Sequence, residues 1–240
     1  MAVLAMIAAI LVLPEVTAAA ATDCAKLAVG VVLPSLFPML VLSSVCVSTG
    51  VVARLGTLPS TFVIGLLSGY PVGAAVVEEL ADREVVTREQ AARMLPWCNN
   101  TGPAFIVGVV GAAMWGSPAV GWLLYACHAA SAGAVGLLSL HTLPAVGRQS
   151  QMQKSPLRFP EALTEGVKKA AVSCMNITAF IVFFGVVIAL VEHFTGPLPP
   201  LVVGALEMTQ GVRRAAGMSA PMAVRLAIQS GLMGFAGVSV

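Results

Sequence analysis

Charged side chains are scarce in this sequence. Of its 240 residues, 10% are Asp, Glu, Lys or Arg and 58% are hydrophobic, and the mean hydropathy is +0.92. A soluble domain has about 25% charged and about 45–50% apolar residues, so this chain has too little polar surface to coat a globule. High hydrophobicity with low charge also excludes intrinsic disorder. The composition therefore predicts an all-α, polytopic integral membrane protein that contacts the lipid bilayer.

The sequence also lacks recognisable catalytic and metal-binding motifs. Its five cysteines lie far apart and no two of them form a CxxC pair, which is typical of small packing residues rather than of a metal or redox site. It contains no HExxH, GxSxG or P-loop motif. We therefore expect no enzymatic activity, no cofactor, no metal and no nucleic-acid partner.

Apolar runs of the length needed to cross a bilayer, about 20 residues, predict the membrane-spanning helices. Such runs cover residues 1–22, 27–52, 119–140 and 170–191. The first run alternatively resembles a signal peptide, but it lacks a basic amino-terminal region, and we interpret it as a span. The polar stretch 141–169 has an excess of basic residues, which predicts that it lies in the cytoplasm.

Two polar interruptions divide the apolar sequence between the second and third spans. The first is Ser68-Gly69-Tyr70-Pro71-Val72-Gly73, where two glycines and a proline predict a break in the helix. The second is Asn99-Asn100-Thr101-Gly102-Pro103. Between them, Thr87-Arg88-Glu89-Gln90 fits a capping box, so a helix should start there. The pattern predicts a re-entrant hairpin followed by a broken helix.

The second half of the chain repeats these features in the same order. Glu207-Met208-Thr209-Gln210-Gly211 interrupts a short apolar segment, Ser219 with Pro221 marks a helix start, and Gly231–Gly237 predicts a second break. Gly102 matches Gly234 at a fixed offset of 132. When the predicted spans are counted outward from the cytoplasmic stretch 141–169, the two copies have opposite orientations in the membrane. Inverted repeats with broken helices are typical of secondary transporters.

We accordingly predict one membrane domain over residues 1–240. It consists of a first repeat over 27–140, a cytoplasmic connecting loop over 141–169 and a second repeat over 170–240. Non-helical backbone survives at membrane depth only against protein or a watery cavity. Half-helix amino termini favour anions there, whereas free carbonyls favour cations. We expect the two tips and the two breaks to face one another around one polar pocket near the bilayer midplane.

The side chains and backbone at these interruptions are the candidate substrate- or ion-binding residues. Asn99 and Asn100 bind solute or cap the broken helix ends. Glu207 binds a coupling proton or cation or contacts solute, or it pairs with Arg213 or Arg214 at the interface. His128, in the middle of a span, relays protons or packs. The full candidate site is Ser68, Gly69, Tyr70, Pro71, Gly73, Asn99, Asn100, Thr101, Gly102, Pro103, Glu207, Thr209, Gln210 and Gly211.

Several of these motifs together resemble a known family. Five segments are similar to motifs of the sporulation integral membrane protein YlbJ group (stage V sporulation protein V), within the nucleoside-recognition or Gate superfamily. They are Gly69–Ala74, Cys98–Ile106, Leu33–Pro38, Glu207–Gly211 and Gly234–Ser239. The resemblance covers roughly residues 29–240. Compared with that family, the chain is short between Gly50 and Gly65 and ends at Val240 where members continue, so we expect a truncated second repeat.

The resemblance implies an architecture similar to concentrative nucleoside transporters. It also implies transport of a small anionic or nucleoside-like solute by alternating access, with dipicolinic acid during sporulation as one candidate and the outer forespore membrane as the location. Related transporter architectures often oligomerise, so a homo-oligomer is one candidate assembly. The alternative is a non-transporting assembly or gating component of a sporulation membrane complex.

Overall fold

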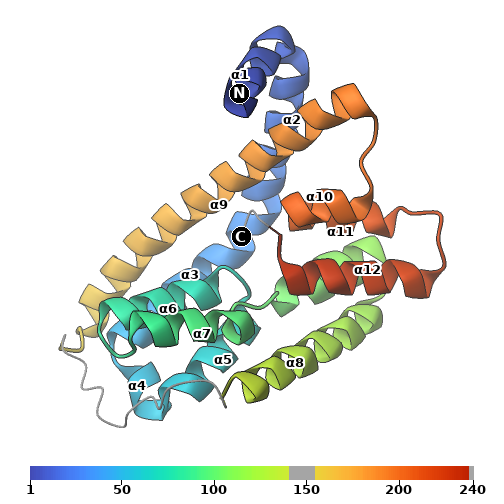
Figure 1. Cartoon of the computed structure of the whole chain (residues 1–240). Coiled ribbons are helices and arrows are strands. Elements are labelled where there is room, and N and C mark those ends of the chain that lie inside the picture. Colours follow the sequence, from blue (N-terminus) through green and yellow to red (C-terminus); the bar gives the residue numbers. More distant parts are fainter. Residues whose placement is uncertain (141–154, 238–240) are drawn as a thin grey trace. The chain divides into compact units, whose positions relative to one another are not determined.

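The computed structural model describes residues 1–140 and 155–237, and all regular structure in these ranges is helical. This confirms the predicted all-α class. Figure 1 shows the chain as helices joined by short connections. The helices are α1 (Ala2–Val12), α2 (Pro14–Leu27), the π-helix η1 (Ala28–Val32), α3 (Leu33–Ser48), α4 (Val51–Leu55), α5 (Thr57–Ser68), α6 (Val72–Asp82), α7 (Arg88–Cys98), the π-helix η2 (Ala104–Met114), α8 (Pro118–Leu140), α9 (Phe159–Thr195), α10 (Pro200–Leu206), α11 (Met208–Ala216) and α12 (Met222–Phe235).

Two helices in the described ranges are long and apolar enough to cross a membrane unaided. They are Pro118–Ser139 in α8 and Phe159–Thr195, which is the whole of α9. The apolar stretches Leu36–Ser48, Thr57–Ser68, Ala104–Met114 and Met222–Phe235 are shorter helices. Because a full crossing takes about 20 residues, these helices suit half-spans and hairpin arms, as expected for a chain with interrupted helices.

The first predicted span is not one straight helix. Val3–Val12 and Pro14–Gly30 pass the test for a span only as a pair, and they meet at an angle of 98°. Pro14 starts the second helix, where its missing N–H costs nothing, but it cannot continue the first one. The span predicted over residues 1–22 is therefore a bent pair of helices, and the bend between α1 and α2 is visible in Figure 1.

The chain divides into two compact units, one of Met1–Pro34 with Ser173–Val240 and one of Ser35–Val172. We call the second of these the central unit and the first the terminal unit. In the central unit, α5 packs on α6 and α7, α7 also packs on α8, and α8 packs closely on η2. In the terminal unit, α10, α11 and α12 pack on one another.

The polar stretch predicted as a connecting loop is partly helical. Residues 141–154 lie outside the described residues, but α9 begins at Phe159 and runs for 37 residues. Glu161 lies in its first turn, where a carboxylate complements the positive end of the helix dipole. The helix therefore includes residues 159–169, which we had assigned to the loop, and continues through the span predicted over residues 170–191.

Candidate functional site

The two predicted interruptions of the central unit are real breaks, and they touch each other. The first separates α5 from α6 at residues 69–71, with Gly69 at φ +83°. The second separates α7 from η2 at residues 99–103. A Cβ at Gly69 would lie 2.7 Å from the backbone nitrogen of Gly102, and one at Gly102 would lie 2.9 Å from the Cα of Gly69. Only glycine at both positions permits this approach.

The carbonyl of Cys98, at the end of α7, lies between the two arms of the hairpin. A Cβ at Gly65 on α5 would come within 1.8 Å of this oxygen, and one at Gly73 on α6 within 2.0 Å. Gly73 was a predicted site residue, whereas Gly65 was not. The two glycines therefore let the broken end of α7 insert against both arms.

Side chains satisfy part of the backbone that the second break leaves unpaired. The Asn100 side-chain amide donates to the carbonyl of Trp97 at 2.8 Å, and the Thr101 backbone N–H donates to Nε2 of His128 at 3.0 Å. Asn100 and Thr101 are almost fully buried. For Asn100 the geometry thus supports capping of the broken helix, which was one of its two alternatives. For His128 it supports a hydrogen-bonded packing role in preference to a proton relay.

Asn99 differs from its neighbour Asn100. Its side-chain oxygen Oδ1 is buried and has no hydrogen-bond partner among the described residues. The indole N–H of Trp97, two residues earlier in the chain, is likewise buried without a partner in this part of the structure. Buried polar groups are nearly always hydrogen-bonded. The break therefore holds an acceptor, and the last turn of α7 holds a donor, that the described protein groups leave available.

The remaining predicted residues of these breaks sit at helix ends. Tyr70 is partly buried, with its hydroxyl oxygen shielded from solvent. Ser68 is the last residue of α5 and is buried. Pro71 and Pro103 directly precede the first residues of α6 and η2. Proline at such a position fixes the entry of the chain into the next helix.

Glu207 is the break between α10 and α11, and it caps α11. Its two carboxylate oxygens accept hydrogen bonds from the backbone N–H groups of Thr209 at 3.0 Å and Gln210 at 2.8 Å. The residue is 2% exposed. The predicted polar tip of five residues is therefore a break at one residue, because Thr209, Gln210 and Gly211 already belong to the helix that Glu207 starts.

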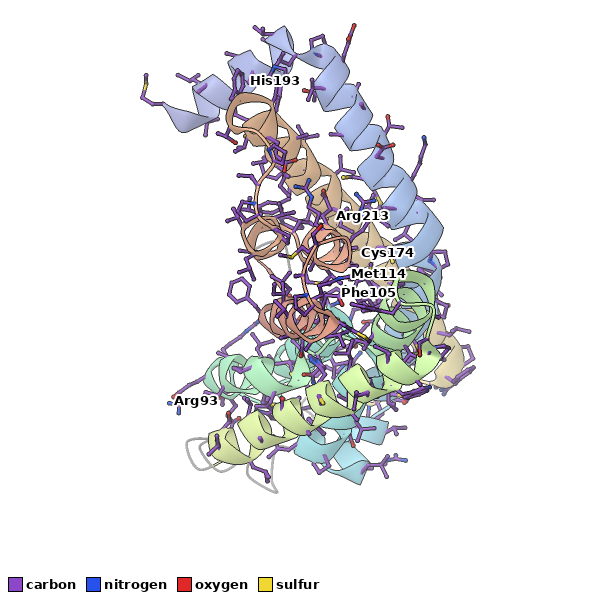
Figure 2. All side chains as sticks on the ribbon, turned by 90° about the vertical axis from the view of Figure 1, so that its right-hand side faces the viewer. Arg93, Phe105, Met114, Cys174, His193 and Arg213 are labelled. Atoms are coloured by element: carbon purple, nitrogen blue, oxygen red, sulfur yellow. The ribbon has the colours of Figure 1, made fainter. Side chains whose placement is uncertain are left out.

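The ion pair from Glu207 to Arg213 or Arg214, one of the alternatives left open for this carboxylate, is absent from the described residues. Arg214 instead pairs with Glu192 at the end of α9, where Nη2 lies 2.9 Å from Oε2. Glu192 also accepts a hydrogen bond from the backbone N–H of Leu198 at 2.8 Å. This ion pair thereby connects the carboxyl-terminal end of α9 to α11. Figure 2 labels Arg213 and His193, the sequence neighbours of this ion pair.

Gln210 and Gly211 face two different neighbours in the terminal unit. The Gln210 amide donates to Sγ of Cys24 at 3.5 Å, and a Cβ at Gly185 on α9 would lie 2.2 Å from that sulfur. A Cβ at Gly211 would lie 2.2 Å from the Cα of Gly204. Gly211 is therefore required for the close crossing of α10 and α11, whereas Gln210 is held by a buried thiol.

The break predicted at Gly231–Gly237 occurs only at the end of that range. Helix α12 continues to Phe235, and Ala236 and Gly237 then take positive φ angles of +68° and +86°. Gly231 and Gly234 are helical with open space around them. Gly234 is therefore not the counterpart of Gly102, because the break lies three residues beyond the position that the fixed offset gave.

Gly237 nevertheless has the same kind of neighbour as Gly102. A Cβ at Gly237 would lie 3.1 Å from the carbonyl oxygen of Gly204 and 3.3 Å from the backbone nitrogen of Met208, on either side of the Glu207 break. In each unit, considered by itself, the break after the third helix packs on the break of the preceding hairpin. This shared arrangement supports an internal repeat, while the inverted orientation remains a prediction.

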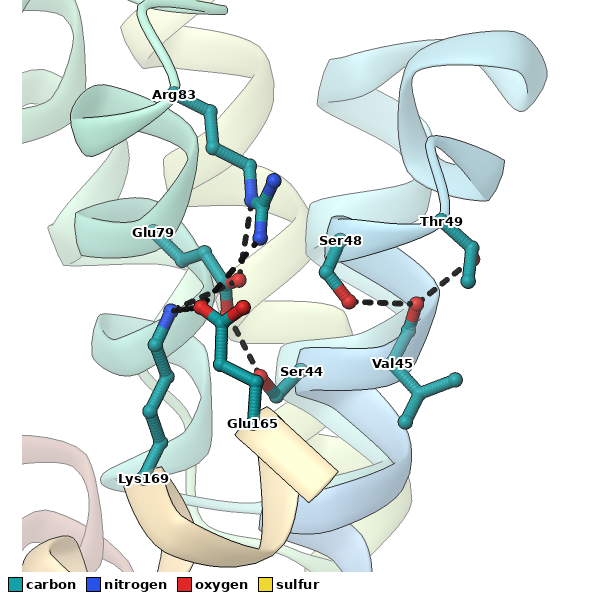
Figure 3. Close-up of polar contacts among 8 residues, drawn as sticks. All are labelled: Ser44, Val45, Ser48, Thr49, Glu79, Arg83, Glu165 and Lys169. Carbon is teal, nitrogen blue, oxygen red and sulfur yellow. Dashed lines mark hydrogen bonds and ion pairs between the residues drawn. The ribbon is translucent and has the colours of Figure 1, made fainter. Parts of the chain in front are cut away.

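A buried ion-pair network was missed by sequence reasoning. Glu79 on α6 accepts from Ser44 on α3 at 2.9 Å and pairs with Arg83 at 3.1 Å and with Lys169 on α9 at 3.0 Å. Glu165 completes the network (Figure 3). The many charged residues of the segment 78–93 favour a solvated surface and give no sign of this burial. The spacing of four between Glu79 and Arg83, repeated in Glu165 and Lys169, was the available signal.

Arg93, by contrast, lies on the surface. It pairs with Glu89 four residues earlier at 2.8 Å, and both side chains are substantially exposed. Figure 2 shows Arg93 extending outward from α7. The exposed pair provides a counterpart to the buried one on α6.

Together these features define an integral membrane protein in which short helices end in tightly packed, glycine-dependent breaks. The chain is 24% identical over 269 aligned positions to the sporulation integral membrane protein YlbJ of Bacillus subtilis (strain 168), an alignment that covers 88% of this chain. This similarity supports the relationship to the YlbJ family that the motifs indicated. The chain spans 65% of the length of that relative. No family model matches the chain. No solved structure matches it either.

Proposed function

We propose that this protein moves a small anionic or nucleoside-like solute across a membrane, with dipicolinic acid during sporulation as one candidate. The B. subtilis relative is described by its name as a sporulation integral membrane protein. The broken helices of the central unit supply polar groups inside an apolar chain, which is how secondary transporters build their binding sites. A coupling proton or cation and a homo-oligomeric assembly belong to the same proposal.

The observation that carries this proposal is the contrast between the two adjacent asparagines. The side-chain amide of Asn100 donates a hydrogen bond to the carbonyl of Trp97, whereas the buried Oδ1 of Asn99 has no partner among the described residues. A solute with an N–H or O–H donor would satisfy Asn99, and an acceptor on the same solute would satisfy the indole N–H of Trp97. Protonated carboxyl groups and nucleobase edges offer donors and acceptors of this kind.

The test is flux into liposomes that contain the purified protein. Dipicolinate and a panel of nucleosides serve as labelled solutes. We expect Asn99→Ala to lower flux by at least about tenfold, the change expected for losing one buried hydrogen bond to a ligand, while the melting temperature without solute stays unchanged. Asn100→Ala is the matched control, because it should lower the melting temperature first.

A binding measurement separates transport from mere assembly. A solute that binds the folded protein raises its melting temperature by mass action, and Asn99→Ala should abolish that rise. Wild-type protein that folds, binds none of these solutes and shows no flux would contradict the proposal and favour the non-transporting assembly or gating role.

A further inference from the structure

The ion-pair network of the central unit consists of two helix-internal pairs that face each other. On α6, Glu79 and Arg83 are four residues apart and are joined at 3.1 Å. On α9, Glu165 and Lys169 are four residues apart and are joined at 2.9 Å. The contacts between the helices are Lys169 to Glu79 at 3.0 Å and Arg83 to Glu165 at 3.6 Å. Figure 3 shows all four side chains converging from the two helices.

This arrangement means that each helix carries its own counter-ion. If the start of α9 moves away from α6, Glu79 keeps Arg83 and Glu165 keeps Lys169. Removing one partner of a buried pair is strongly destabilising because it leaves an uncompensated charge, yet replacing a whole buried ion pair by apolar residues is often neutral or favourable. A permanent contact between α9 and α6 would therefore not need charged residues. A contact that opens and closes benefits from them, because each helix then keeps an ion pair of its own when the two helices separate.

The α9 side of the network is partly exposed at the surface of the protein. The side chains of Lys169 and Glu165 are 45% and 39% exposed, whereas those of Glu79 and Arg83 are 7% and 6% exposed. The two charges on α9 can thus regain hydration when that helix leaves. The charges on α6 remain paired with each other and with the Ser44 hydroxyl.

Apart from the ion-pair network, the residues that the start of α9 buries, over 159–170, are small. Ala162 and Ala170 are buried, and Gly166 lies between them at the helical spacing of four. A Cβ at Gly166 would lie 3.1 Å from the carbonyl oxygen of Val41 on α3. Hydrophobic stabilisation scales with the apolar area buried. Small side chains therefore allow a close contact between the helices that takes little free energy to separate.

We infer that Glu79, Arg83, Glu165 and Lys169 form a releasable clamp, by which the first three turns of α9 dock on α6 and α3 and undock without stranding a charge. The clamp joins α9 to α6, which is the second arm of the hairpin that is interrupted at Gly69. This inference concerns motion within the central unit and does not depend on the identity of any solute.

The test is a charge swap that preserves composition. In the α9 swap, Glu165→Lys with Lys169→Glu keeps the net charge and the spacing of four but opposes like charges across the helices. The local backbone amides of residues 159–169 are then followed by hydrogen exchange in purified protein in lipid nanodiscs. We expect exchange to rise by roughly ten- to a hundredfold, because a like-charge contact in a partly buried setting is worth several times RT.

A second swap restores the attraction. Adding Glu79→Arg with Arg83→Glu to the α9 swap again opposes unlike charges, and exchange should return to within a few-fold of the wild type. The matched control is Glu89→Arg with Arg93→Glu on α7, which reverses an exposed pair of the same spacing and should leave exchange in α9 unchanged. It also controls for the dependence of such pairs on their orientation along the helix.

The outcomes are decisive in both directions. Fast exchange confined to residues 159–169 in the α9 swap, with rescue in the fourfold variant, supports the clamp. Unchanged exchange in the α9 swap, or no rescue, overturns it. If the α9 swap does not yield folded protein, Lys169→Gln removes only the contact to Glu79 and the pair on its own helix. Uniformly faster exchange throughout α6, α7 and α9 in that variant would identify a static structural contact and overturn the inference as well.

Discussion

The backbone N–H of Thr101 donates a hydrogen bond to Nε2 of His128 at 3.0 Å. A side chain of α8 thereby caps a donor that the break after α7 has freed. In an apolar environment such a donor needs a partner, so His128 supports the non-helical segment. In this geometry Nε2 carries no proton, which argues for a structural role in preference to the proton relay.

Substitutions of His128 test this role. His128→Phe fills the space but cannot accept, so the buried N–H of Thr101 loses its partner, at a cost of about 1–3 kcal/mol in the free energy of unfolding. His128→Gln provides an acceptor and should recover part of that loss. Denaturant unfolding in detergent measures both. Equal stability of the two variants would show that the hydrogen bond contributes nothing.

The contact between Gly69 and Gly102 predicts a steep dependence on side-chain size. Alanine at either position would place a Cβ 2.7–2.9 Å from backbone atoms of the other break, and Gly69 also has a positive φ angle. We expect Gly69→Ala and Gly102→Ala each to destabilise by about 1–3 kcal/mol or more. Thermal unfolding of purified protein measures the loss.

Gly108 provides the matched control for these variants. It lies in η2, shortly after the second break, and a Cβ there would meet nothing within 4 Å. Gly108→Ala should therefore be neutral or slightly stabilising, because alanine is favoured over glycine in helices by roughly 0.5–1 kcal/mol. A similar loss of stability at all three positions would mean that the close approach of the two breaks is not their reason for being glycine.

Local patterns in the sequence predicted the interruptions of the central unit well. The capping box at Thr87 is present, with Thr87 accepting from the Gln90 N–H at 3.1 Å and the Gln90 side chain accepting from the Thr87 N–H at 2.9 Å. Glycine and proline placed the breaks at residues 69–71 and 99–103. These features depend on neighbours within a few residues, which a sequence displays directly.

Features that depend on distant residues could not be predicted in this way. Glu79 finds Lys169 some ninety positions later in the chain, so its burial was not visible from a run of charged neighbours. Gly231 and Gly234 were predicted to break a helix, yet both are helical and have open space around them. The partner across the fold, rather than local propensity, decides such positions.

The ion pair between Glu192 and Arg214 predicts a measurable coupling in the terminal unit. Their side chains are 20% and 28% exposed, and the carboxylate also accepts from the Leu198 N–H. A double-mutant cycle of Glu192→Gln and Arg214→Met should give a coupling of about 0.5–3 kcal/mol, the range for residues in one ion-pair network. Unfolding by denaturant measures the four proteins. An additive cycle would mean that the pair contributes nothing beyond its separate parts.

Glu207 provides a test that separates capping from charge. Its carboxylate accepts two backbone N–H groups at the start of α11, so Glu207→Ala should lower stability by about 0.5–2 kcal/mol, as for other lost helix caps. Glu207→Asn keeps a capping oxygen and removes the charge, and it should retain most of that stability. Thermal unfolding compares them, and liposome flux on the same samples adds a second readout. If Glu207→Asn unfolds as readily as Glu207→Ala, the negative charge itself stabilises the start of α11 through the helix dipole. If Glu207→Asn is stable but carries no flux, the charge serves transport in addition to the fold.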